Sequence, residues 1–109
     1  MAQDDMHVVM YRILTYLYAC MKEGARPDKV MYDAEAMGIN ETYWNGIMAE
    51  LSRRKLVKGV DAKALADKDY VVLGNVRITM EGVEFLMENS MMAKAKTFLM
   101  DIKAAVPFV

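Results

Sequence analysis

The sequence of 109 residues contains one cysteine, one histidine and two prolines, and these scarcities exclude several classes of protein. A lone cysteine, Cys20, cannot form an internal disulfide, so a disulfide-stabilised secreted scaffold is excluded. His7 and Cys20 are spaced to point in nearly opposite directions on one helix, and they provide neither a zinc ligand set nor a catalytic pair. No apolar run approaches the roughly 20 residues that a membrane helix needs. We therefore expect a soluble, cytoplasmic protein that is not an enzyme and uses no cofactor, metal or membrane.

The chain also lacks an excess of either charge, because 14 Lys and Arg against 15 Asp and Glu give a net charge of −1. Without bulk positive charge, nucleic-acid binding has to come from a local patch. The local positive excess is the cluster Arg53, Arg54, Lys55 and Lys58. A phosphate-binding patch explains this cluster, and so does a solvated helix end whose cations complement the helix dipole.

Hydrophobic residues, in contrast, make up 55% of the chain, and 12 of them are methionines. A chain of this length folds as one compact domain and buries enough surface to form a core without metals or disulfides. Methionine at helical spacing is typical of an adaptable core. We expect a single domain over residues 1–109, in which Cys20 is a small buried thiol.

Apolar residues recur at three- and four-residue intervals in the first half of the chain, which is the spacing of amphipathic helices. The helices that this spacing predicts cover residues 5–22, 28–37 and 41–54. Gly24 and Pro27 end the first helix, Gly38 ends the second in a left-handed conformation, and Asn40 is a suitable N-cap for the third. The side chains expected to face the core are Val9, Ile13, Leu14, Leu17, Tyr18 and Met21 in the first helix, and Val30, Met31, Ala34 and Met37 in the second. Two helices joined by a short turn that contains glycine are typical of a helix-turn-helix.

The third helix decides the functional interpretation because its two faces differ. Its inward ridge, spaced to pack on the two preceding helices, consists of Ile39, Trp44, Ile47, Met48 and Leu51. The residues expected on its outer face are Glu41, Thr42, Tyr43, Asn45, Gly46, Ala49, Glu50 and Arg53. A recognition helix leaves such a face free for a DNA groove.

Three short strands are predicted after the third helix, over residues 56–60, 70–73 and 76–79. Gly74–Asn75, between the last two, is a two-residue hairpin signal. The charged segment 61–69 is expected to be a mobile loop. Thr79 is a candidate N-cap for a helix over 80–89, and Ser90 for one over 91–105. In the former, Val83, Leu86 and Met87 are expected to face the core.

This order of elements predicts a mainly α (α+β) fold. It is a winged helix-turn-helix with a three-helix core, a hairpin or three-stranded wing over 56–79, and two additional C-terminal helices.

Two runs of residues resemble a known family. They are Gly38-Ile39-Asn40 with Leu51, Leu56-Val57 and Gly59-Val60, and then Ile78-Thr79-x-x-Gly82-x-x-Phe85-Leu86-x-x-Asn89. They resemble the core of the YjcQ family, small proteins of Gram-positive bacteria and their prophages, and the resemblance extends from the first helix to about residue 103. It implies a winged-helix domain with Thr79 as a cap, Gly82 at a close helix contact and Gly59 at the wing. The resemblance brings no activity with it, since the Ile-Thr-x-x-Gly element is shared with many winged-helix regulators.

The first hypothesis of function is binding of double-stranded DNA by a small bacterial or prophage transcriptional regulator. Thr42 and Asn45 are able to contact base edges, and basic residues after them are able to hold phosphates. The residues expected at the DNA are Thr42, Tyr43, Asn45, Gly46, Ala49, Arg53, Arg54, Lys55, Lys58 and Arg77, with Lys63 and Lys68 also on the wing. Glu41 and Glu50 would repel phosphates, so the affinity expected of one monomer is modest.

The second hypothesis is a protein-interaction module that keeps the winged-helix shape without binding DNA. Balanced charge, the acidic residues of the third helix and the many methionines favour it. The apolar stripe of the helix over 91–105 packs either on the first helix or against its mate in a homodimer.

Overall fold

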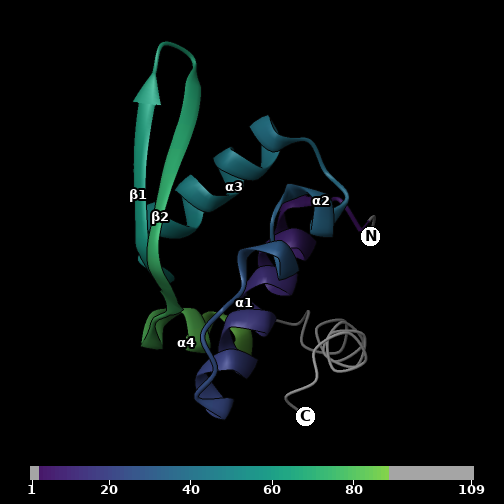
Figure 1. The fold of residues 1–109 in the computed structure, drawn as a ribbon, viewed down its shortest axis with the longest axis vertical. Helices are drawn as coiled ribbons and strands as arrows, with labels where there is room; N and C mark the ends of the chain where they lie inside the picture. The colour runs from purple at the N-terminus through teal and green to yellow at the C-terminus, as the bar shows by residue number, and fades with distance from the viewer. Residues whose placement is uncertain (1–2, 89–109) are drawn as a thin grey trace.

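The structure, a computed structural model, describes residues 3–88 of the chain. In chain order the elements are α1 (Met6–Glu23), the 3-10 helix η1 (Lys29–Met31), α2 (Ala34–Met37), α3 (Glu41–Arg53), β1 (Val57–Leu65), β2 (Lys68–Ile78) and α4 (Met80–Glu88). Figure 1 shows the helices gathered into a body, with the two strands forming a hairpin that rises beyond it. The predicted helix over residues 91–105, and the homodimer expected through it, lie outside the described residues.

α1 is the centre of the core. It confirms the helix predicted over residues 5–22, and it ends at Gly24 with a left-handed φ of 68°. The predicted inward residues that are buried include Val9, Ile13, Leu14 and Leu17. Tyr11 and Tyr16 are buried as well, whereas Met21, predicted to face inward, is 47% exposed. The buried surface is wider than one stripe because α3, α4 and β2 all contact α1.

The single helix predicted over 28–37 is wrong, since the segment divides into η1 and α2. The Asp28 carboxylate accepts a hydrogen bond from the Val30 N–H at 3.1 Å, and Asp33 accepts one from the Ala36 N–H at 2.9 Å. Two aspartate caps within one short segment each start a new turn and so interrupt a continuous helix. Val30, predicted to face the core, is therefore 64% exposed.

α3 begins where the sequence predicts. Gly38 ends α2 with a φ of 72°, and Asn40 Oδ1 accepts a hydrogen bond from the Tyr43 N–H at 2.8 Å. The predicted ridge is confirmed by the buried residues Trp44, Ile47, Met48 and Leu51. Trp44 Nε1 donates to the Tyr32 carbonyl oxygen at 2.8 Å. The indole N–H is therefore satisfied inside the core, and it joins α3 to the turn before α2.

After α3 the chain forms two long strands instead of the three short ones predicted. β1 and β2 are antiparallel, and their turn lies at Ala66–Asp67, where Ala66 has a left-handed φ of 57°. The mobile loop predicted over 61–69 is therefore wrong, because most of these residues pair within the hairpin. The turn predicted at Gly74–Asn75 is also wrong, since both residues lie within β2.

A β-bulge occupies the place where a turn was predicted. The pairing shifts its register between Lys58 and Val60, opposite Gly74–Asn75. Gly59 has a φ of 83°, and a Cβ atom there would collide with the Asn75 carbonyl oxygen. A bulge and a tight turn both need residues that accept unusual backbone angles, so glycine alone does not distinguish them. The bulge divides the hairpin into a base half, Val57–Lys58 with Val76–Ile78, and an outer half, Val60–Leu65 with Lys68–Leu73.

α4 is anchored to the chain that leaves α3. Thr79 caps it as predicted, because the Gly82 N–H donates to Thr79 Oγ1 at 3.0 Å. The Thr79 hydroxyl in turn donates to the Lys55 carbonyl oxygen at 2.6 Å. A Cβ atom on Gly82 would collide with the Leu56 carbonyl oxygen, so glycine allows the close approach. Met87, predicted to face inward, is 57% exposed, because α4 turns a narrower face to the core than its apolar residues suggest.

The described part of the chain is α+β, with helices around one core and a two-stranded antiparallel sheet. Three helical segments, a hairpin and a further helix are compatible with a winged helix, although the second segment is split and the wing has two strands. No helix within residues 3–88 is long and apolar enough to cross a membrane.

Candidate nucleic-acid interface

The outer face of α3 is narrower than the sequence predicts. Thr42 is exposed, and Asn45 and Gly46 are half-buried, so these three residues reach solvent. Ala49, predicted on the same face, is fully buried with 0% exposure. The prediction for Ala49 is therefore wrong, and this residue offers no contact to a groove.

The hairpin causes this difference because it lies along one flank of α3. Both strands contact the helix. Ser52 Oγ donates to the Val60 carbonyl oxygen at 3.0 Å, and Arg53 reaches Asp69 on β2. Helical periodicity predicts which residues share a face, but it does not show that a later segment covers the edge of that face.

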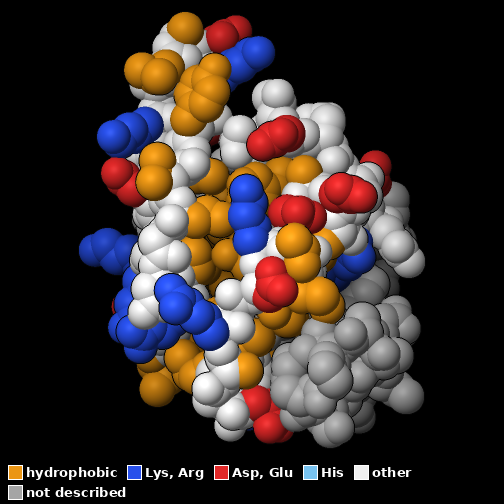
Figure 2. All heavy atoms as spheres, viewed as in Figure 1, with side chains coloured by type: hydrophobic (Ala, Val, Ile, Leu, Met, Phe, Trp, Pro, Cys, Tyr) orange, Lys and Arg blue, Asp and Glu red, His pale blue; other side chains and the backbone are white. Residues whose placement is uncertain are grey.

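Tyr43, also predicted to contact DNA, is turned toward the N-terminal segment. Its hydroxyl donates to the Asp4 carbonyl oxygen at 2.7 Å. Burial and the nearby carboxylates of Asp4 and Asp5 raise the pKa of Tyr43. Glu41 adds another exposed carboxylate in the first turn of α3. The N-terminal end of α3 is therefore acidic, and Figure 2 shows acidic side chains gathered on that side of the molecule.

The two arginines at the other end of α3 are already paired with carboxylates. Arg53 Nη2 lies 2.6 Å from Asp69 Oδ1, and Arg54 Nε lies 2.7 Å from Glu50 Oε2. Exposed ion pairs of this kind contribute only about 0–1 kcal/mol, so they are able to open. Their charges nevertheless cancel locally, and this part of the predicted cluster offers little net attraction for phosphate.

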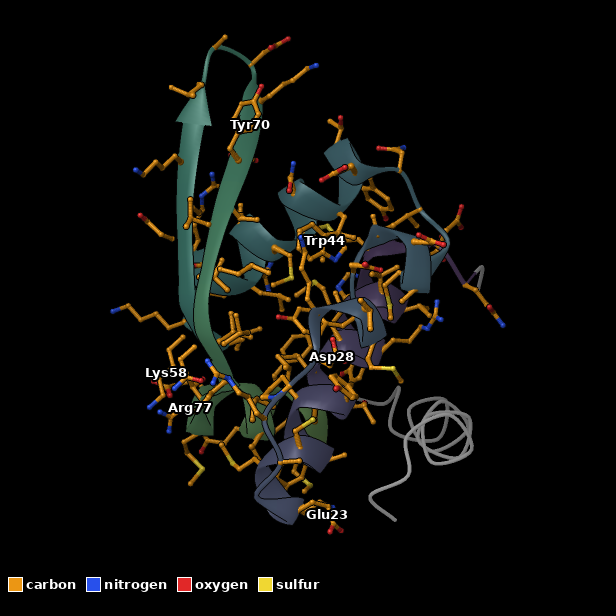
Figure 3. The ribbon with its side chains drawn as sticks, in the orientation of Figure 1. Glu23, Asp28, Trp44, Lys58, Tyr70 and Arg77 are labelled. Atoms are coloured by element: carbon orange, nitrogen blue, oxygen red, sulfur yellow. The ribbon has the colours of Figure 1, made fainter. Side chains whose placement is uncertain are left out.

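Positive charge without an acidic partner in the described part of the chain gathers at the base of the hairpin. Lys58 and Arg77 are register partners on opposite strands, and both are exposed. Lys55 precedes β1, and its carbonyl oxygen accepts the Thr79 hydroxyl beside the end of β2. Within residues 3–88, none of the three cations forms an ion pair with a carboxylate. We call Lys55, Lys58 and Arg77 the basic hairpin base; Figure 3 labels Lys58 and Arg77, and Figure 2 shows the basic side chains gathered there.

Two features of this surface were missed by reasoning from the sequence. Asp4 and Asp5 lie just before and at the start of the first predicted helix, and only the fold brings them to α3. Arg26 follows α1 and shares the lining of a hollow with Arg77 on β2. No periodic pattern connects positions so far apart in the chain. No group of three or more His, Cys, Asp or Glu side chains able to hold a metal lies among the described residues.

The comparison with known proteins agrees with the predicted resemblance. The chain matches the family model described as YjcQ protein over residues 11–105, which includes most of α1 and every later described element. No curated protein and no solved structure matches the chain. Because the matched residues make up most of the sequence, the chain belongs to the YjcQ protein family.

Proposed function

We propose that this protein binds double-stranded DNA, and that it does so chiefly through the basic hairpin base. The observation that carries the proposal is the exposed cluster of Lys55, Lys58 and Arg77, which has no acidic partner within residues 3–88, on a hairpin compatible with the wing of a winged helix. Like charges directly opposite each other destabilise a pair of strands, and a phosphate backbone relieves that repulsion. Such binding would serve transcriptional regulation in a bacterium or a prophage.

The other predicted contacts divide between two roles. Thr42 and Asn45 remain candidates for base contacts, because Thr42 is exposed and Asn45 is half-buried on the solvent side of α3. Arg53 and Arg54 add little attraction while Asp69 and Glu50 balance them. Few free cations and few base-reading side chains imply modest affinity and weak sequence preference for one monomer. A homodimer would double the phosphate contacts, and sedimentation of the full chain tests whether one forms.

The experiment is a salt series with the full chain and a fluorescent, mixed-sequence DNA duplex, followed by anisotropy between about 50 and 200 mM salt. Three phosphate contacts predict a slope of about −3 in a plot of log K against log salt. Binding that is absent at the lowest salt would contradict the proposal. A slope near zero would also contradict it, because phosphate contacts release counterions.

A protein-interaction module is the second candidate, and one observation favours it. Asp4, Asp5 and Glu41 surround the N-terminal end of α3, which is the end that inserts into the major groove in many helix-turn-helix proteins. Phosphates are repelled there, whereas a basic partner protein is attracted. Failure to bind the duplex at low salt, together with capture of a partner that Glu41→Gln releases, would favour this candidate over DNA binding.

A further inference from the structure

A hollow of about 320 Å³ lies between the C-terminal end of α1, the loop that follows it, and β2. Its apolar floor includes Leu17 and Cys20, which are each 1% exposed, and Met21. The polar side chains that line it belong to Arg26, Asn75 and Arg77. A mostly apolar hollow with a few converging polar groups is the usual form of a small-molecule site, and this volume lies at the lower end of the usual range of about 300–1,000 Å³.

The two arginines of the hollow come from distant parts of the chain and have no acidic partner within the described residues. The carboxylates nearest to Arg26 in sequence are Glu23 and Asp28, and neither of them pairs with either arginine. Asp28 accepts the Val30 N–H at 3.1 Å, and Figure 3 shows Glu23 at the end of α1, directed away from Arg77. Two guanidinium groups at one hollow create a positive potential that an anion would neutralise.

The floor of the hollow carries no charge of its own at neutral pH. Burial raises the pKa of the Cys20 thiol, so this side chain stays protonated. Burial also raises the pKa of the neighbouring Tyr16 to about 12. A ligand that fills the hollow therefore meets an uncharged, apolar surface below and positive charge at the rim.

We propose that this hollow binds a small monocarboxylate with an apolar tail. The carboxylate lies between Arg26 and Arg77, because a planar guanidinium matches the two oxygens of a carboxylate. The tail lies on the floor and covers Met21, which is 47% exposed and which a bare inorganic anion would leave uncovered. A neutral apolar molecule would fill the floor but leave both guanidinium groups without a partner. The bound ligand joins the loop after α1 to β2, and this proposal stands whether or not the protein binds DNA, although Arg77 belongs to both sites.

The test compares three probes that separate the head from the tail of the ligand. Hexanoate carries both, acetate carries the head alone, and 1-hexanol carries the tail alone. In an NMR titration of the full chain at constant ionic strength, hexanoate is expected to shift the Leu17 methyl signals and the Cys20 amide in a saturable way. Acetate and hexanol are each expected to bind at least about tenfold more weakly, since each loses one of the two interactions.

Three variants assign the binding to this hollow. Arg26→Gln and Arg77→Gln are each expected to weaken hexanoate binding about tenfold or more, because each removes a charge-assisted hydrogen bond. Lys58 is the cross-strand neighbour of Arg77, but Lys58 does not line the hollow. Lys58→Gln removes the same charge and is expected to leave hexanoate binding within about twofold of the wild-type value. Under the proposed function, the Lys58 and Arg77 variants both weaken DNA binding, but only the Arg77 variant also weakens hexanoate binding. Failure of one proposal is therefore distinguishable from failure of the other.

Four results would overturn the proposal. Equal binding of acetate and hexanoate would mean an adventitious anion only. Equal binding of 1-hexanol and hexanoate would mean that the hollow binds apolar molecules without selecting for a negative charge. Unchanged hexanoate binding by both arginine variants, in proteins that keep the wild-type pattern of amide signals, would place the ligand elsewhere. Absence of saturable hexanoate shifts would mean that the hollow takes no such ligand.

Discussion

The two halves of the hairpin belong to one pair of strands, yet they differ in burial and in charge. In the base half, Val76 and Ile78 are 4% and 1% exposed and complete the core of the body. In the outer half, Tyr70 and Val72 are 46% and 59% exposed, and the hydrophobic residues that pack against the core, Val60, Val71 and Leu73, are only partly buried. The base half is therefore part of the folding unit, whereas the outer half lies against α3 without completing the core.

Charge follows the same division. The outer half places Lys63 Nζ 3.9 Å from Asp61 Oδ2, and Asp69 pairs with Arg53. The outward face of the base half carries Lys58 and Arg77, neither with a described acidic partner. The buried side chains of Val76 and Ile78 hold the base half in position against the core, and the unbalanced positive charge on its outward face attracts anions. Buried residues that complete the core and exposed cations that are proposed to bind an anion therefore alternate along the same short segment.

The largest effect is expected at the bulge that separates the halves. Gly59→Ala should destabilise the fold by about 2–4 kcal/mol, because alanine meets both an unfavourable positive φ and the backbone of Asn75. Gly74→Ala is the matched control on the facing strand, where an added Cβ has only an ordinary contact at 3.5 Å with the Gly59 carbonyl oxygen. It should cost less than about 1 kcal/mol in urea unfolding. Equal losses for both variants would contradict the bulge.

A smaller effect comes from one substitution made on each side of the bulge in β2. Val76→Thr should cost about 1–3 kcal/mol, because it places a hydroxyl among buried apolar side chains. Val72→Thr makes the same chemical change at a residue that is 59% exposed, and the cost should stay within about 0.5 kcal/mol. Thermal unfolding of the two variants measures the difference. Similar melting temperatures would mean that the outer half is as much a part of the folding unit as the base half.

The smallest effect concerns the loop that faces the base half. The Tyr16 hydroxyl accepts the Asp28 N–H at 3.0 Å, so Tyr16→Phe should cost about 1 kcal/mol at neutral pH. Burial raises the pKa of Tyr16 from 10.0 to about 12, so the folded state binds this proton more tightly than the unfolded state. The contribution of protonated Tyr16 to the free energy of unfolding is complete below about pH 10 and is lost as the pH rises toward about 12.

Tyr16→Phe should therefore flatten the alkaline loss of stability as well as lower stability at neutral pH. Tyr11 and Tyr32, whose pKa values burial also raises, keep part of the slope in the variant. Urea unfolding at about pH 8 and about pH 11 should show the gap between wild type and variant narrowing. A gap that is constant or grows with pH would mean that Tyr16 does not keep its proton through burial.

Local signals in the sequence predict α1, α3 and α4 well because each of these signals depends on neighbouring residues. Asn40 and Thr79 cap the helices that they were expected to cap, and the Trp44–Leu51 ridge is buried. The hairpin could not be predicted in the same way. Glycine next to asparagine marks backbone freedom, and only the register of the partner strand decides between a turn and a bulge. Asp28 and Asp33 likewise split a helix that the apolar spacing alone predicts as continuous.

The candidate site was predictable in its residue types but not in its electrostatics. Arg53 and Arg54 form the most basic pair in the sequence, yet Asp69 and Glu50 balance them. Arg77, an isolated cation in the sequence, becomes part of a cluster because β2 places it opposite Lys58. The Arg53–Asp69 ion pair and the Lys58–Arg77 register pair depend on contacts between distant segments, which no local pattern encodes, whereas Glu50 and Arg54 lie only four residues apart at the end of α3.

The most direct test of the central claim compares two double variants that remove the same formal charge. Lys58→Gln with Arg77→Gln should make the salt dependence of duplex binding shallower by about 2, one for each phosphate that the variant no longer neutralises. Arg53→Gln with Arg54→Gln should lower affinity through the unbalanced Asp69 and Glu50, but leave the slope nearly unchanged. A slope that becomes shallower in the Arg53 and Arg54 double variant, but keeps its wild-type value in the Lys58 and Arg77 double variant, would contradict binding at the hairpin base.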